Sequence, residues 1–134
     1  MGKLQEFLLE QEIGEEQMEV SIAPFPFPFV IKSITEAENK AIRKGCQKVS
    51  FDKKTRQKQT ETNLDLYNSR LVTACCVEPN FKDAALQEKF GVCGAEDLIN
   101  KLLKPGQYTD LLLAVQEING FNDDINELKE TAKN

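Results

Sequence analysis

The chain has 134 residues, of which 40% are hydrophobic and 29% are charged, and its net charge is −5. A chain of this length buries roughly two-thirds of its unfolded surface, so we expect a single domain over residues 1–134 rather than wholesale disorder. No apolar run is long enough to span a bilayer, and the first residues lack the pattern of a secretory signal. We therefore expect a cytoplasmic protein with no membrane partner.

Residue types that carry chemistry are scarce. The sequence contains no histidine, which removes the usual general base at neutral pH, and it contains no phosphate-binding glycine loop. A zinc site would need all four cysteines at unusual spacing, so we interpret them as reduced, small apolar core residues. We predict that the chain is not an enzyme and has no catalytic, cofactor-binding or metal site. The four cysteines are Cys46, Cys75, Cys76 and Cys93.

Residues 1–19 are expected to form a helix and an acidic connection. A helix over residues 3–11 would place four side chains along one side, namely Leu4, Phe7, Leu8 and Gln11. Residues 10–19 are rich in glutamate and contain Gly14, which is typical of a mobile connection.

Residues 20–34 form the only strongly strand-like region, in which Val20 and Ile22 alternate with polar residues. Proline then alternates with phenylalanine, so in an extended chain Phe25, Phe27 and Phe29 share one face. The missing N–H donors predict an edge strand protected against pairing, rather than a polyproline ligand, because P-x-x-P spacing is absent. At least one ring is expected in the core, so that Phe27→Ala costs about 3 kcal/mol; the alternative is an exposed apolar patch.

Residues 35–61 are expected to form a helix and a basic loop. Thr35 and Glu38 fit a capping box for a helix over residues 36–44 that ends at Gly45. Residues 40–58 carry eight basic side chains against Asp52 alone, a net charge of +7. Such a strip could attract nucleic acid, which makes a small nucleic-acid-binding regulator the alternative function. With Phe51 as its single aromatic residue, the strip is better interpreted as a solvated loop or hairpin.

Residues 62–134 have apolar side chains at helical spacing, punctuated by glycine and proline. Helices are predicted over residues 64–77, 82–89, 95–103, 107–118 and 122–131. Leu111, Leu112 and Val115 belong to the strongest apolar face. The expected fold class is α+β, mainly α, with a short N-terminal strand or hairpin region followed by a bundle of short helices.

Three stretches carry a resemblance to a known family. They are PFVIKSITEAE, the chain from NLDLYNSRLVTACCVEPNFKDAALQEKFGV to DLINKLLKPGQYTDLLLAVQEINGF, and the final AKN. Over residues 29–134, their order and spacing are similar to those of the XkdN-like tail assembly chaperones of PBSX-type phages and prophages in Gram-positive hosts. Gln107-Tyr108 departs from that family, in which an acidic residue is expected after Pro105-Gly106.

The resemblance implies a non-enzymatic chaperone that binds and solubilises the tape-measure protein during tail morphogenesis. Such a protein would act in the bacterial cytosol and be absent from the mature virion. The chain itself is the other expected partner, through self-association or through a longer form made by ribosomal frameshifting near Ala132-Lys133-Asn134; nucleic acid is not an expected partner. Apolar faces would accept amphipathic client helices. The predicted partner-binding residues are Phe25, Phe27, Phe29, Leu111, Leu112 and Val115.

Overall fold

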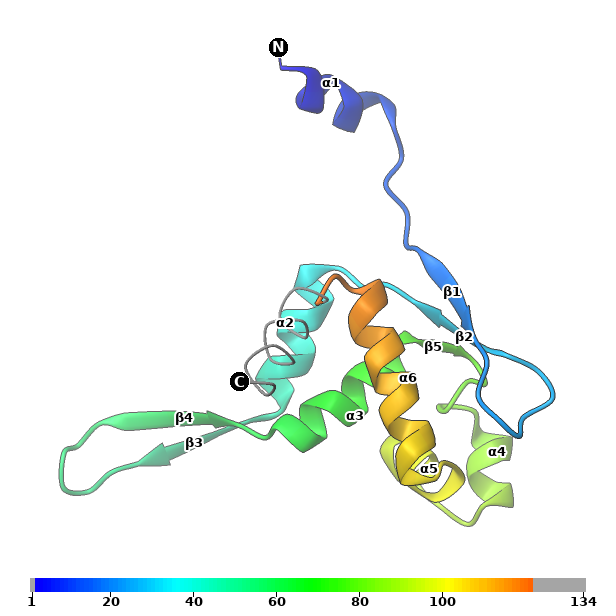
Figure 1. The fold of residues 1–134 in the computed structure, drawn as a ribbon. Helices are drawn as coiled ribbons and strands as arrows, with labels where there is room; N and C mark the ends of the chain where they lie inside the picture. The colour runs from blue at the N-terminus through cyan, green and yellow to red at the C-terminus, as the bar shows by residue number, and fades with distance from the viewer. Residues whose placement is uncertain (1, 122–134) are drawn as a thin grey trace, which may run out of the picture.

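The computed structural model describes residues 2–121, in which helices and strands are interleaved along the chain (Figure 1). The helices are α1 (Lys3–Glu10), α2 (Glu36–Gly45), α3 (Leu64–Cys75), α4 (Ala84–Lys89), α5 (Ala95–Leu102) and α6 (Pro105–Ile118). The strands are β1 (Gln17–Val20), β2 (Phe29–Lys32), β3 (Gln47–Phe51), β4 (Lys58–Thr62) and β5 (Cys76–Glu78). No helix in these residues is both long and apolar enough to cross a membrane.

The expected fold class is wrong in its arrangement. We expected the strands near the N-terminus and a helical bundle after them, but β3 and β4 lie between α2 and α3, and β5 follows α3. The protein is an α+β mixture with two small sheets, one of order β1-β2-β5 and one formed by β3 and β4. One source of the error lies at residues 76–78, because the helix predicted over residues 64–77 extends into this segment, where the chain instead pairs with β2.

Strand β2 is the central strand of the first sheet. It pairs antiparallel with β1 from Gln17↔Lys32 to Val20↔Phe29, and with β5 at Ile31↔Cys76. The predicted edge strand over the proline-phenylalanine run is therefore wrong. Because proline cannot donate to a sheet, the run forms the β1–β2 loop, and the strand begins at Phe29, after the last proline.

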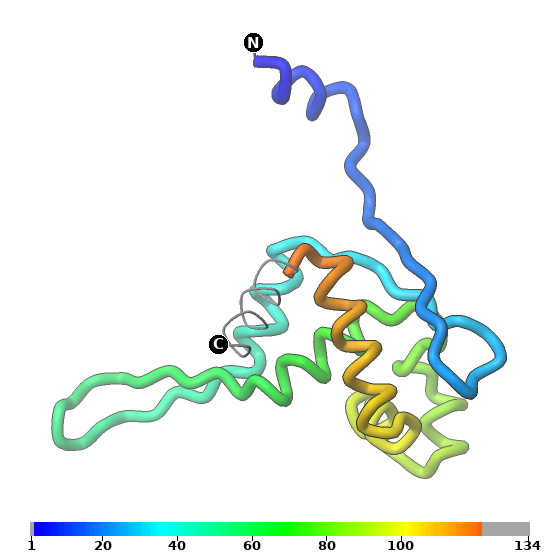
Figure 2. Tube along the Cα trace, viewed as in Figure 1, coloured from blue at the N-terminus to red at the C-terminus, as the bar shows by residue number. Residues whose placement is uncertain are grey.

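The hydrophobic core is one cluster that joins the β1–β2 region to the helices of residues 64–118. Helix α6 lies against α3 and against strands β1 and β2 (Figure 2), while α5 packs on α3. Side chains of β2, α3, α5 and α6 supply most of the fully covered volume. They include Phe29, Ile31, Leu71, Val72, Cys75, Leu98, Ile99, Leu111 and Val115.

Local signals fix where most helices begin. The capping box at the start of α2 is confirmed, since the Glu38 N–H donates to Thr35 Oγ1 (3.2 Å) and the Thr35 N–H donates to Glu38 Oε1 (3.3 Å). Asn63 caps α3 in the same way, by accepting from the Leu66 N–H (3.1 Å). The helix predicted over residues 122–131 and the tripeptide at residues 132–134 lie outside the described residues.

Two elements, α1 and the β3–β4 hairpin, project from the rest of the molecule, which we call the body (Figure 1). Helix α1 stands at the end of an extended connection, and none of its residues is buried. Strands β3 and β4 form an antiparallel hairpin from Gln47↔Thr62 to Phe51↔Lys58, exposed throughout except at the half-buried Thr62. The hairpin interpretation of the basic segment is thereby confirmed.

Candidate partner-binding surfaces

An apolar groove of about 280 Å³ lies where the β1–β2 loop meets the segment from β5 to α4. We call it the Pro-Phe groove. The loop lines it with Phe25 and Phe29, whose rings meet edge to face with centroids 5.2 Å apart. Pro79, Leu86 and Phe90 line it from the following segment. The groove can therefore accept apolar side chains with little polar desolvation.

The loop beside this groove is held in place although it carries no regular structure. The Phe25 N–H donates to the Ile22 carbonyl (3.0 Å), and the Gln107 amide donates to the Ala23 carbonyl (2.7 Å), which ties the loop to α6. Phe27 lines the groove yet remains 79% exposed. A large apolar side chain on an anchored loop is a preformed contact surface.

Of the two expectations for the three phenylalanine rings of the proline-phenylalanine run, the structure confirms one and contradicts the other. Phe29 is buried, which confirms that at least one ring belongs to the core, and Phe25 is half-buried against it. The expected cost of about 3 kcal/mol for Phe27→Ala is wrong, because an exposed ring leaves no cavity when it is truncated.

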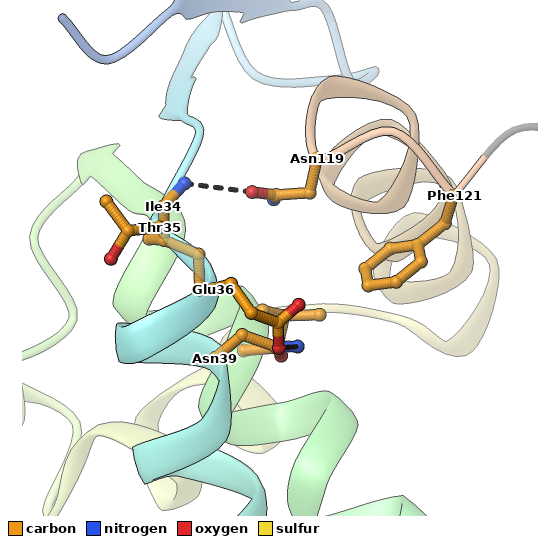
Figure 3. A pocket seen from close by; sticks show the side chains of 7 residues that line it. Ile34, Thr35, Glu36, Asn39, Asn119 and Phe121 are labelled. Atoms are coloured by element: carbon orange, nitrogen blue, oxygen red, sulfur yellow. Dashed lines mark hydrogen bonds between the residues drawn. The ribbon is translucent and has the colours of Figure 1, made fainter.

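A second, more polar pocket of about 210 Å³ lies between the start of α2 and the end of α6 (Figure 3). Figure 3 shows Asn119 reaching across to the chain before α2, where its Oδ1 accepts from the Ile34 N–H (2.9 Å). The Asn119 amide nitrogen also donates to the Val115 carbonyl (2.8 Å). Since the chain itself satisfies these polar groups, the pocket is a structural junction between α2 and α6.

Beneath this junction the buried Asn39 accepts a hydrogen bond from the Tyr67 hydroxyl and donates to Glu36 Oε1 (3.2 Å). Burial raises the pKa of Tyr67 above its ordinary value, which already lies well above neutral pH, so the phenol is protonated and serves as a donor. Within residues 2–121, every buried side-chain nitrogen and oxygen has a partner. The interior of these residues therefore leaves no buried side-chain nitrogen or oxygen unpaired for a ligand to bind.

The cysteines are all free; Cys46, Cys75 and Cys76 are buried, whereas Cys93 is exposed. Burial raises the pKa of the Cys75 thiol and raises that of Cys76 to about 12. Both thiols are therefore protonated at neutral pH and are poor nucleophiles. The described residues contain no group of three side chains that could hold a metal ion.

The two projecting elements carry further exposed apolar side chains. On α1 these include Leu4, Phe7 and Leu8, and on the hairpin they are Val49 and Phe51, all about half or more exposed. In the body, by contrast, side chains of the same size are mostly covered.

A family model described as "Phage XkdN-like tail assembly chaperone protein" matches residues 4–133, nearly the whole chain. The chain belongs to this family. The resemblance seen in the sequence is thereby confirmed. Two relatives of this XkdN-like chaperone come from Bacillus subtilis strain 168. YqbN is 29% identical over 96% of this chain and 91% of its own length, and the phage-like element PBSX protein XkdN is 28% identical over 80% and 72%.

A crystal structure of YqbN has the same fold. It superposes with a TM-score of 0.69 over 90% of this chain and 98% of the other, at 23% identity. At that identity the likeness concerns the fold alone.

The predicted partner-binding residues of this XkdN-like chaperone fall into two groups. Phe25, Phe27 and Phe29 come together at the Pro-Phe groove, although Phe29 is buried beneath it. The other three lie on α6, where Leu111 and Val115 are fully buried and Leu112 is half-buried against the core. Their assignment to a partner surface stays a prediction, and the covered side chains of α6 offer little area to a partner.

Sequence reasoning missed the second side of the groove, formed by Pro79, Leu86 and Phe90. These residues meet the loop only because β5 pairs with β2, a contact between residues 76–78 and residues 30–31. No local pattern in a single sequence indicates that pairing. The apolar side of α1 was visible from its spacing, but its exposure was not.

Proposed function

We propose that this XkdN-like chaperone binds the phage tape-measure protein in the host cytosol, keeps it soluble, and leaves before the virion is complete. The observation that carries the proposal is the Pro-Phe groove with Phe27 beside it, because a preformed apolar groove is suited to the apolar side of a client helix. Membership of a family of tail assembly chaperones supports the same role.

The shape of the groove favours weak, repeated binding. A site of about 280 Å³ takes only a few apolar side chains, so each copy contributes a modest affinity. Several copies along one long client gain strength through effective concentration and can still be displaced one at a time. The net charge of −5 helps to keep such an assembly dispersed.

The proposed role requires no chemical step. The buried thiols of Cys75 and Cys76 are held protonated, and the sequence has no histidine to serve as a general base. We infer a non-enzymatic protein whose activity is binding.

The test is co-expression with the tape-measure protein of the same phage. We expect the parent chain to raise the soluble yield of the client and to co-purify with it in several copies. Phe27→Ala should reduce co-purification without lowering the melting temperature, since the ring is 79% exposed. Leu64→Ala is the matched control, because Leu64 is also an exposed apolar side chain but lies outside the groove.

Two results would count against the proposal. An unchanged client yield with no co-purification by the parent chain would remove the chaperone role. Equal losses for Phe27→Ala and Leu64→Ala would leave the role but move the client away from the Pro-Phe groove.

A further inference from the structure

Helix α1 lacks the packing that a helix of its length needs. It has eight residues, none of them buried, whereas isolated helices shorter than about 12–15 residues are marginal in water. Leu4, Phe7 and Leu8 share one side of it, and all three are exposed. A short helix with an exposed apolar side gains stability when that side packs against another surface.

The β3–β4 hairpin also has an apolar face on which no other element of the described residues packs. A two-stranded hairpin is marginally stable alone and gains independent stability when its apolar face packs on another element. Val49 and Phe51 lie on one face because side chains alternate along a strand, and their partners across the hairpin are Thr60 and Lys58. We call these four residues the hairpin face. Val49 and Phe51 are 63% and 59% exposed.

The two elements have opposite charge. Helix α1 carries Lys3 against Glu6 and Glu10, a net charge of −1, and the connection after it adds three glutamates, of which Glu15 is already paired with Lys32. Residues 47–62 carry five basic side chains against two acidic ones, a net charge of +3. Glu10 lies one turn from Phe7 on α1, and Lys58 lies opposite Phe51, so opposite charges flank the two apolar surfaces.

We propose that α1 of one copy packs on the hairpin face of a second copy. The connection to its own body is short, because Glu16 is fixed to Ser33 by two hydrogen bonds, and Glu15 pairs with Lys32 (3.5 Å). The free residues 11–14 span at most about 14 Å. Helix α2, about 15 Å long, and then the hairpin strands separate that anchor from Phe51. The connection is therefore too short for α1 to reach the hairpin of its own chain.

Figure 1 shows α1 and the hairpin projecting from different parts of the body, which agrees with that limit on reach. A second copy can bring its α1 to the hairpin without such a constraint. If two copies exchange their α1 helices, both helices and both hairpins are covered in one closed dimer. The two contacts then reinforce each other through effective concentration.

The test uses the full chain alone, so it does not depend on the tape-measure protein. Sedimentation velocity over a wide concentration range should show reversible self-association. Phe7→Gln and Phe51→Gln should each weaken it about tenfold or more, since each removes a buried aromatic contact. Leu64→Gln is the matched control and should associate like the parent. Unchanged thermal melting of all three variants would show that the body stays folded.

Mixing distinguishes a contact between copies from a contact within one copy. The Phe7→Gln chain keeps an intact hairpin, and the Phe51→Gln chain keeps an intact α1, so an equimolar mixture should form a dimer more readily than either variant alone. Charge reversal gives a second test of the same contact. Glu10→Lys and Lys58→Glu should each weaken association severalfold, and the chain with both substitutions should recover part of the loss.

Three results would overturn the proposal. The parent could stay monomeric at every concentration, or both variants could associate as strongly as the parent. Alternatively, the mixture could associate no better than the separate variants. A hairpin that binds duplex DNA at low salt, with Phe51→Gln leaving self-association unchanged, would instead assign the basic strip to nucleic acid.

Discussion

The body and the two projecting elements use similar apolar side chains with opposite results. In the body, Leu71 and Leu111 are completely covered by packing between helices and the sheet. On α1 and the hairpin, Phe7 and Phe51 face solvent. Residue type and periodicity thus show that a face is apolar, but the neighbouring elements decide whether this chain covers it or leaves it exposed.

This difference separates stability from binding. Substitutions inside the body should lower the free energy of unfolding, whereas substitutions on the projecting elements or at Phe27 should mainly affect association.

Thiol reactivity measures how closed the body is. A thiol whose pKa is raised to about 12, as for Cys76, has a thiolate fraction roughly a thousandfold below that of an ordinary thiol, equivalent to about 4 kcal/mol. In the native protein at pH 8, a thiol reagent should label the exposed Cys93 rapidly and Cys75 and Cys76 far more slowly, as read by mass spectrometry of peptides. Comparable labelling rates would show that the body opens readily.

The same burial gives a pH dependence of stability. Because the folded pKa values of Cys75 and Cys76 are raised, the unfolded chain loses these protons first as pH rises. Their contribution to stability is complete below the unfolded pKa of about 9 and is progressively lost above it. Denaturant melts at pH 7 and pH 9.5 should show the decrease, and replacing both cysteines by alanine should reduce it.

Truncation in the core should be the most damaging single change. Leu71→Ala removes a fully buried side chain where α3 meets the rest of the core, and we expect it to lower the free energy of unfolding by about 3 kcal/mol. The control is Leu9→Ala on α1, where the side chain is 70% exposed and the change should stay within about 0.5 kcal/mol. Urea unfolding measures both. Similar losses would contradict the separation of body and projections.

The junction between α2 and α6 should have an intermediate effect. Asn119→Ala leaves the Ile34 N–H without its partner and removes the link to the end of α6, at a cost of about 2 kcal/mol. Asn100→Ala, at an exposed position of α5, is the control and should be nearly neutral. If urea unfolding shows no difference between the two, water replaces the amide and the junction is not structural.

The boundaries that the sequence predicts well are those set by neighbouring residues. The capping box of Thr35 and Glu38 and the helix over residues 3–11 depend on contacts within a few residues, and the hairpin in the basic segment joins residues at most 15 apart; each is present in the structure. Such signals operate in any tertiary environment that leaves the segment intact.

The features that the sequence did not predict depend on distant contacts. The role of β2 as a central strand requires β5, which lies more than forty residues later, and the continuous helical pattern concealed that strand. The Pro-Phe groove has the same origin, because Phe90 reaches Phe25 only through this sheet. The exposure of Phe27 likewise depends on the proline run forming a loop instead of a strand.

The smallest expected effect concerns the capping box at the start of α2. Thr35→Ala removes the hydroxyl that accepts from the Glu38 N–H at the start of α2, and we expect a loss of about 1 kcal/mol. Thr55→Ala, in the exposed hairpin turn, is the matched control and should be neutral. Because α2 connects the sheet to the hairpin, the loss should appear in the urea unfolding of the whole body. A full-sized loss confined to hydrogen exchange in α2, with global unfolding unchanged, would instead place α2 with the projecting elements.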